Sequence, residues 1–380
     1  MAARPVLNLA AAALAGFALL IFISRLPLRS ASLVHRVSPT DLALRLPRLN
    51  FTSSSPSTSR HKEYYASEAA AEFCAAHGYS VFTPESDSGE RKIYDLFMAN
   101  SELDFLEIRL STMYDHVDYF IIVESPVTFQ GTLKNLTIRD NWDRFSQWHD
   151  KMIYHLLEFP AGFAPKLTWD YEDLQRDATF KQVFPKLQGR QAPVKGDVLL
   201  VADVDEIVRP ATLLLLRTCN FPRRLTLASK FYYYSFEFLH VGNEWPHPQA
   251  TFYQGERDTI LPSKLRSADG DSRLQRARES GTLSNAGWHC SSCFATMDQF
   301  LNKMASFSHM WMNEPKYRDK GRIAAAVREG RDVWGRASEV FRRIEGNTDV
   351  PGVLAEAEGR RRFGYMLSRD GESAGFSDYP

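Results

Sequence analysis

The sequence has no surplus of charge of either sign. Lysine plus arginine and aspartate plus glutamate both number 46, so the formal net charge at pH 7 is zero. A nucleic-acid-binding protein normally carries a basic excess, so we exclude that class and expect no nucleic-acid partner. The remaining composition, 44% hydrophobic and 24% charged, is ordinary for a globular chain with a substantial core.

Cysteine is also scarce, with four residues at positions 74, 219, 290 and 293. Cys290 and Cys293 form a C-x-x-C pair, but no second pair is present to complete a four-ligand zinc site. Redox catalysis by such a pair needs thioredoxin-like surroundings, which the sequence lacks. We therefore expect a structural disulfide or buried thiols at this pair.

Only one long apolar run is present, and it lies at the N-terminus. Residues 6–24 are almost continuously apolar, with Asn8 as the polar interruption. At ~1.5 Å per residue the run is just long enough to cross a bilayer core. A transmembrane signal anchor is therefore the favoured interpretation, and a cleaved signal peptide or a buried helix are the alternatives. More arginines follow the run than precede it, which argues mildly against a cytoplasmic N-terminus.

The remaining composition shifts along the chain and predicts a simple domain order. Serine, proline and arginine dominate after the apolar run, as in a flexible stem. The sequons at Asn50 and Asn135 fit a secretory-pathway lumen, where cysteines meet an oxidising environment. The predicted parts are a short tail (1–5), the anchor (6–24), the stem (25–62), one catalytic domain (63–335) and a peripheral C-terminal segment (336–380).

Candidate strands and helices alternate through the catalytic domain. This order predicts an α/β fold with a mostly parallel sheet. Ligands of such sheets bind beyond the carboxyl ends of the strands, where Glu124, Ser125 and the acids from Asp203 onward are placed. The expected strands are 119–123, 152–157, 198–202 and a strand or hairpin over 225–238; the expected helices are 64–76, 103–113, 168–187 and 297–305.

Three carboxylates stand together in the stretch DVDE, residues 203–206, directly after a buried-looking strand. Like charges this close repel one another, and burial increases the cost. If the strand continues, Asp203 and Asp205 project from the same side, which suits a hard cation such as Mg²⁺ or Mn²⁺. The alternative is a solvated aspartate-rich turn.

Four sequence blocks resemble glycosyltransferase family 17 when taken together and in order. They span about residues 93–315 and read YDLFMANSELDFLEIRLSTMYDHVDYFIIVES, LLVADVDEI, GWHCSSCF and SFSH. The family commonly has proline directly after D-x-D-E-I, whereas Val208 and Arg209 intervene here before Pro210. We therefore expect the following loop to differ from that of the family. Because loops determine acceptor choice, the identity of the acceptor is left open.

The resemblance implies a GT-A-like, Rossmann-type fold and a divalent metal, Mn²⁺ or Mg²⁺. It implies inverting transfer of N-acetylglucosamine from UDP-GlcNAc to a mannose of an N-glycan. The partners would be a UDP-sugar donor, an N-glycan or glycoprotein acceptor and, through the anchor, a membrane. The location would be the Golgi membrane, as a single-pass type II protein with a lumenal catalytic domain.

The resemblance also implies roles for individual residues. Glu124 at a strand end could instead cap a turn, Arg176 could pair with Glu172 or Asp173, and Trp288 could belong to the core. The expected metal site consists of Asp203, Asp205, His309 and His289. The expected contacts to the donor nucleotide and sugar are Glu124, Ser125, Arg176, Asp203 and Trp288.

Inverting transfer needs one general base to take the proton of the acceptor hydroxyl. Asp298 is the first candidate, although an acid at a helix start is also favoured by the helix dipole. Glu206 is the second, although it could instead orient a metal ligand. The aromatic stretches 231–234 and 245–247 line an acceptor groove or belong to the core.

Other functions stay open at this point. Contacts to the donor could select another nucleotide sugar, or the protein could bind glycans or nucleotides without turnover. A metal-dependent phosphodiesterase would need more histidine and aspartate ligands for a two-metal centre.

Overall fold

The computed structural model describes residues 65–84, 90–306 and 309–380. The predicted tail and anchor and the whole predicted stem lie outside these ranges, so those predictions stay untested. Within the described ranges, no helix is both long and apolar enough to cross a membrane. All described residues belong to one compact unit, residues 39–380.

Four parallel strands form one half of the sheet, in the order β3-β2-β1-β4. Each is a short apolar run; β2, β3 and β4 lie where the sequence predicts strands, whereas the central strand β1 was not predicted. In the register, Glu124 pairs with Ala99 and Asp203 pairs with Met98, so the ends of β2 and β4 flank the end of β1. These strands are β1 (Ile93–Ala99), β2 (Tyr119–Glu124), β3 (Met152–Leu156) and β4 (Val198–Asp203).

The other half of the sheet combines antiparallel pairs with one long parallel pair, β6 with β9, so the sheet is mixed and the expectation of a mostly parallel sheet is confirmed only in part. β8 runs antiparallel to β4 and β6, and β7 runs antiparallel to β6 and β10. A single residue, Tyr234, separates β6 from β7, and so short a link permits only antiparallel pairing, because parallel strands need a long crossover. The strands are β5 (Glu206–Val208), β6 (Arg224–Tyr233), β7 (Ser235–His240), β8 (Gln249–Phe252), β9 (Ser280–Ser291) and β10 (Phe341–Arg343).

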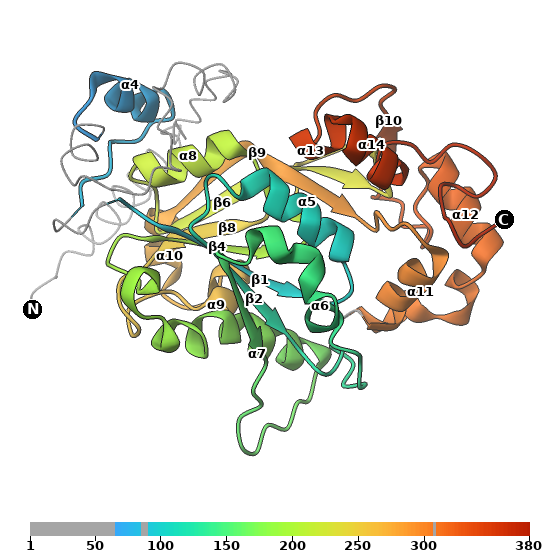
Figure 1. Cartoon of the computed structure of the whole chain (residues 1–380), viewed down its shortest axis with the longest axis horizontal. Helices are drawn as coiled ribbons and strands as arrows, with labels where there is room; N and C mark the ends of the chain where they lie inside the picture. The colour runs from blue at the N-terminus through green and yellow to red at the C-terminus, as the bar shows by residue number, and fades with distance from the viewer. Residues whose placement is uncertain (1–64, 85–89, 307–308) are drawn as a thin grey trace, which may run out of the picture. The chain divides into compact units, whose positions relative to one another are not determined.

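Helices cover both faces of the parallel half (Figure 1). Successive side chains of a strand point to opposite faces. Accordingly, Ile93 and Phe97 of β1 pack in one core with Phe105 of α5, whereas Tyr94 and Leu96 pack in another with α7. The helices of this part are α4 (Glu68–Ala76), α5 (Leu103–Met113), α6 (Thr137–Asp140), α7 (Thr168–Lys181), α8 (Pro210–Thr218), α9 (Pro262–Arg266) and α10 (Arg273–Glu279).

The C-terminal segment is an integral part of the fold rather than a peripheral one. Arg369 is fully buried and donates hydrogen bonds to the carbonyl oxygens of Tyr234 and Phe294, both at 2.8 Å. Phe363 belongs to the same core as α5. These contacts could not be predicted from the charged, glycine-rich composition of the segment, because only a few of its residues make them. The segment contains α13 (Gly352–Ala355) and α14 (Ala357–Phe363), and α11 (Met297–Ser306) and α12 (Lys320–Glu329) precede it.

All four cysteines are paired in two disulfides. Cys74 of α4 bonds Cys219 directly after α8, and Cys290 bonds Cys293 at the end of β9. The second bond confirms the structural interpretation of the C-x-x-C pair. The first joins positions 145 residues apart and fastens α4 to the sheet-bound α8.

Candidate active site

The acidic stretch forms a turn between two strands. β4 ends at Asp203 and β5 begins at Glu206, so the strand alternation expected for Asp203 and Asp205 does not continue. Both carboxylates nevertheless line one cavity at the carboxyl ends of β1 and β4. The cavity holds about 940 Å³ when its open mouth is included.

A buried arginine of α5 fixes the backbone of this turn. Arg109 is fully buried and forms a two-pronged ion pair with Asp95 of β1, at 2.5 and 2.6 Å. Its remaining terminal nitrogen donates to the carbonyl oxygens of Asp203, at 3.1 Å, and Glu206, at 2.7 Å. These bonds tie backbone carbonyl groups at both ends of the turn to α5, so α5 holds the turn in place.

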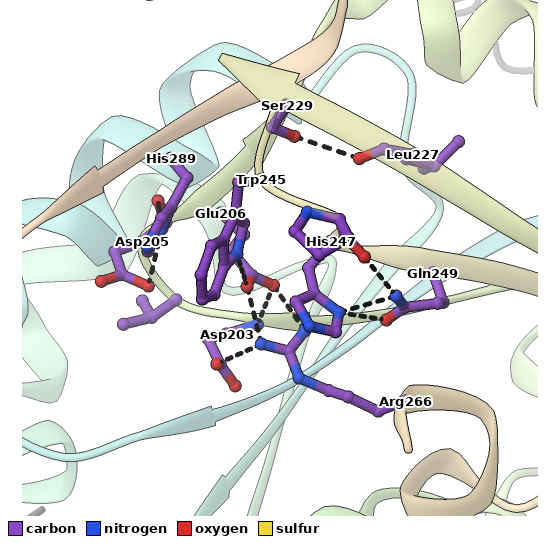
Figure 2. A network of polar contacts seen from close by, with 12 residues as sticks. Asp203, Asp205, Glu206, Leu227, Ser229, Trp245, His247, Gln249, Arg266 and His289 are labelled. Atoms are coloured by element: carbon purple, nitrogen blue, oxygen red, sulfur yellow. Dashed lines mark hydrogen bonds and ion pairs between the residues drawn. The ribbon is translucent and has the colours of Figure 1, made fainter. Parts of the chain in front are cut away.

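Two further arginines bind the acids at either end of the turn, and Figure 2 shows one of them, Arg266. Arg266, the last residue of α9, binds Asp203 Oδ2 at 2.5 Å and both oxygens of Glu206 at 2.6 and 2.7 Å. Arg176 of α7 binds Asp203 Oδ1 at 2.9 Å. Trp245 Nε1 donates to Glu206 Oε1 at 2.7 Å. These contacts occupy the oxygens of both acids within the protein.

The same arginines shift the protonation equilibria of the turn. Burial alone would raise the pKa of Glu206, but the charge and hydrogen bonds of Arg266 outweigh it and hold this pKa well below its ordinary value. The pKa of Asp203 is lowered in the same way, against burial, by Arg266 and Arg176. Burial, then Arg266, lowers the pKa of His247 nearby. Both acids are therefore ionised and His247 is neutral at pH 7.

Asp205 has a different environment, with a histidine in place of the arginines. Its Oδ1 lies 3.6 Å from His289 Nδ1, and its Oδ2 lies 3.8 Å from Lys303 Nζ. The imidazole of His289 stacks between the rings of Phe231 and Trp245, with centroids 5.2 and 4.7 Å away. The ring is thus held rigidly beside Asp205, and both residues line the cavity.

This pair fits part of a divalent-cation site. In the described ranges, no three histidine, cysteine, aspartate or glutamate side chains gather as a complete protein cage. A carboxylate oxygen and an imidazole nitrogen at 3.6 Å match a site in which the substrate and water supply the other ligands, as Mg²⁺ and Mn²⁺ sites with phosphate substrates commonly do. The donor set therefore fits a metal held jointly by the protein and a diphosphate.

The cavity also carries cations that the sequence did not reveal. Lys134 and Lys303 line it together with Arg176. Burial lowers the pKa of Lys134, and the nearby Glu124 opposes that shift. Lys134 and Lys303 are both distant in sequence from the acids of the turn. The one sequence feature that could have indicated a site role was the position of Lys303 in the helix between the blocks GWHCSSCF and SFSH. These three cations stand among the four carboxylates of the lining, so the cavity offers partners both to a metal ion and to phosphate oxygens.

Three residues expected at the donor site face elsewhere. Glu124 is fully buried and accepts hydrogen bonds from the backbone of α6 and from the hydroxyl of Tyr154, so the capping alternative describes it. Ser125 is buried and accepts from the amide of Val127. Trp288 points to the other side of β9 and donates to Asp349.

The remaining expected site residues are Asp298, Glu206 and His309. Asp298 and His309 lie outside this cavity, and the carboxylate of Glu206 is bound by other side chains. Asp298 lines neither this cavity nor its neighbour, and its side chain is 80% exposed. Glu206 is fully buried in its contacts with Arg266 and Trp245. His309 lines the neighbouring cavity, with its ring against Trp169.

Comparison with known proteins identifies the class: this protein is a glycosyltransferase. The sequence model of glycosyltransferase family 17 matches residues 20–345, and the chain belongs to this family. The resemblance inferred from the four sequence blocks is thereby confirmed.

Three curated relatives are similar to the chain at 24% identity over 270 residues. Each is a β-1,4-mannosyl-glycoprotein 4-β-N-acetylglucosaminyltransferase, from Homo sapiens, Rattus norvegicus and Mus musculus. The match covers 63% of this chain and 48% of each relative, so the chain spans about half the length of the curated relatives it matches. Among solved structures, the mannosyltransferase PcManGT from Pyrobaculum calidifontis, in complex with GDP-Man and Mn²⁺, is 9% identical, with 72% of this chain and 70% of that chain covered and a TM-score of 0.31. So low a score carries no argument about this site.

Proposed function

We propose that this glycosyltransferase moves N-acetylglucosamine from UDP-GlcNAc to a mannose of an N-glycan, with a divalent metal and with inversion at the anomeric carbon. The observation that carries the proposal is the pairing of Asp205 with His289 in a cavity at the carboxyl ends of β1 and β4. Membership of family 17 and the names of the curated relatives support the choice of sugar and acceptor.

The cavity supports a nucleoside diphosphate as the donor's leaving group. Lys134, Arg176 and Lys303 place three cationic side chains along its walls, and a diphosphate needs such partners when it leaves water. When bound, a divalent cation supplies Lewis-acid stabilisation of the departing diphosphate. Asp205 and His289 are the residues that would hold it.

The acids at the ends of the turn have a positioning role in this proposal. Asp203 and Glu206 are bound by Arg266, and Arg109 holds the backbone between them. Asp205 therefore stands on a turn whose two ends cannot shift. Such preorganisation lowers the reorganisation needed when charge develops on the leaving group.

The cellular setting belongs to the same proposal: a Golgi membrane protein of type II, anchored by residues 6–24, with a lumenal catalytic domain. The two disulfides support an oxidising compartment. Asn135 of the second sequon is exposed, as a glycosylated asparagine must be.

The test uses the full-length chain made in a secretory host and purified in detergent. The protein is incubated with Mn²⁺ or Mg²⁺ and a panel of UDP- and GDP-sugars, and released nucleotide is measured with and without mixed N-glycans. We expect glycan-stimulated release of UDP from UDP-GlcNAc that EDTA abolishes. Stimulated release from another donor would reassign the sugar. Binding of UDP without any release would favour a binding protein.

A further inference from the structure

A second cavity adjoins the one that contains Asp205. Trp245, His289, Ser291 and Lys303 line both, so a ligand in either cavity lies against the same wall. The second cavity holds about 750 Å³ when its mouth is included. It lies between the end of β9, helix α11 and the beginning of the C-terminal segment. Two substrates that react with one another would need such adjoining sites.

Aromatic rings form much of this second cavity. Phe231 and Tyr233 of β6, Phe300 of α11 and Trp334 line it from three different parts of the chain. Phe300 and Trp334 stack with centroids 6.3 Å apart, so the ring faces are held by the core. A pyranose presents an apolar face of C–H groups and a polar edge of hydroxyls, and an apolar pocket with a few polar groups matches that pattern.

Glu339 is the carboxylate of this cavity among the described residues that line it. Its side chain is 21% exposed, and its Oε2 lies 3.7 Å from Nε2 of His240, a residue that does not line the cavity. Arg336 stands beside it in the lining and is held by Asp332. The hydroxyl of Ser338 donates to the other oxygen, Oε1, at 3.3 Å, so Ser338 and His240 together position a carboxylate that still lines the cavity.

From this geometry we infer that the second cavity binds the acceptor sugar and that Glu339 takes the proton of the attacking hydroxyl. The inference rests on the proposed function and adds the acceptor site and the base to it. The acceptor oxygen forms a bond to the anomeric carbon, and the bond from that carbon to the diphosphate breaks. Its electron pair leaves with the diphosphate, and the hydroxyl proton passes to Glu339.

This assignment gives the C-terminal segment a part in the reaction. Trp334, Arg336 and Glu339 all lie around the boundary at which the sequence predicted the catalytic domain to end. It also replaces Asp298, whose exposed side chain faces neither cavity. Acceptor choice is then set by residues after α12, since β5 passes through Arg209 alone into α8 and leaves no loop after Val208.

The first experiment compares Glu339→Gln with Glu345→Gln in the full-length protein. Glutamine keeps the shape but cannot accept a proton, and Glu345 is exposed and outside both cavities. We expect E339Q to lower kcat for glycan transfer by about 10²- to 10⁴-fold with an unchanged Kd for UDP-GlcNAc, and E345Q to match the wild type. Unchanged transfer by E339Q, or weakened donor binding, would overturn the inference.

A second comparison reports acceptor binding without turnover. Trp334→Phe trims the aromatic wall, and Trp142→Phe is the matched control, because Trp142 stacks on His149 away from both cavities. Saturation-transfer NMR with a mannose-terminated N-glycan and UDP is expected to show about 3- to 10-fold weaker glycan binding for W334F only. Equal binding by W334F and the wild type would overturn the acceptor site. If the wild type binds glycan in this way but transfers no sugar, the proposed function fails and the site stands.

Discussion

Arg266 and Glu206 form a two-pronged ion pair, with nitrogen–oxygen distances of 2.6 and 2.7 Å, at the carboxyl end of the sheet. The carboxylate is fully buried. A buried acid is expensive to leave without its partner, so this pair joins the stability of the fold to the geometry of the site.

Replacing Arg266 by methionine is expected to lower the free energy of unfolding by about 3–5 kcal/mol, because Glu206 stays buried without its cation. Urea unfolding followed by circular dichroism measures this loss. The surface variant Arg139→Met removes an exposed pair with Asp140 and is expected to change stability by less than about 1 kcal/mol. Equal losses in the two variants would show that the buried pair has no special role.

Asp205→Asn and Asp203→Asn are expected to separate activity from stability. Asp205 contacts no guanidinium, so its change should reduce transfer at least about 100-fold, the upper range for losing even an outer partner of a metal, with little change in melting temperature. Asp203 binds two arginines, so its change should also lower the melting temperature. Steady-state kinetics and thermal unfolding of both variants decide this. An active, EDTA-sensitive D205N enzyme would exclude Asp205 as a metal ligand.

Arg109 is expected to act on both the core and the turn. Arg109→Met alone leaves Asp95 buried and uncompensated, and we expect a loss of about 3–5 kcal/mol. The double variant Arg109→Met/Asp95→Leu removes both charges and should recover much of that stability. Its transfer rate should stay low, because the carbonyl oxygens of Asp203 and Glu206 still lack a donor. Recovery of both stability and transfer would mean that the turn keeps its conformation without the hydrogen bonds from Arg109.

The two disulfides are expected to differ in what they contribute. Closing a loop of 145 residues restricts the unfolded chain far more than closing one of three. The loop-entropy relation gives about 5 kcal/mol for Cys74–Cys219 and about 2 kcal/mol for Cys290–Cys293. Unfolding of the two double-serine variants measures the difference. The reverse order would show that strain or packing, rather than the unfolded chain, determines their effect.

Stability is expected to fall in acid through the acids of the turn. The folded-state pKa values of Glu206 and Asp203 are lowered, so their contribution is complete above their ordinary values near pH 4. It is lost as the pH falls through the lowered folded values. The unfolding free energy of Glu206→Gln should therefore depend less on pH below about 4 than that of the wild type. Parallel slopes from urea titrations at several acidic pH values would contradict this assignment.

The sequence predicted three of the four strands of the parallel half, because buried strands leave continuous apolar runs such as residues 198–202, but it missed β1. It also predicted the hairpin of β6 and β7 within 225–238, whereas β8, β9 and β10 were missed, because they depend on pairing between distant segments. The carboxylate turn was recognisable, since three acids after an apolar strand are rare. Its counter-charges were not, because Arg266 lies 63 residues from Asp203 and meets it through the packing of α9.

The same limit explains the residues that the structure places away from the cavity. Glu124 was correctly placed at a strand end, but only the return of the chain at α6 shows that backbone amides occupy it. Trp288 and His289 are neighbours in sequence, and the strand turns one toward Asp349 and the other toward Asp205. The sequence block predicted that both residues lie near the site. Which of the two side chains faces the site depends on the register of the strand, which the sequence does not show.

The burial of Arg369 has a consequence for how the protein is made. Its guanidinium joins Tyr234 to Phe294, so this part of the interior stays open until residue 369 has left the ribosome. The parallel strands can form earlier during synthesis, whereas the core behind the second cavity must wait for this arginine. A premature stop codon shortly before position 369 would therefore leave the nascent enzyme unfinished, as a target for quality control.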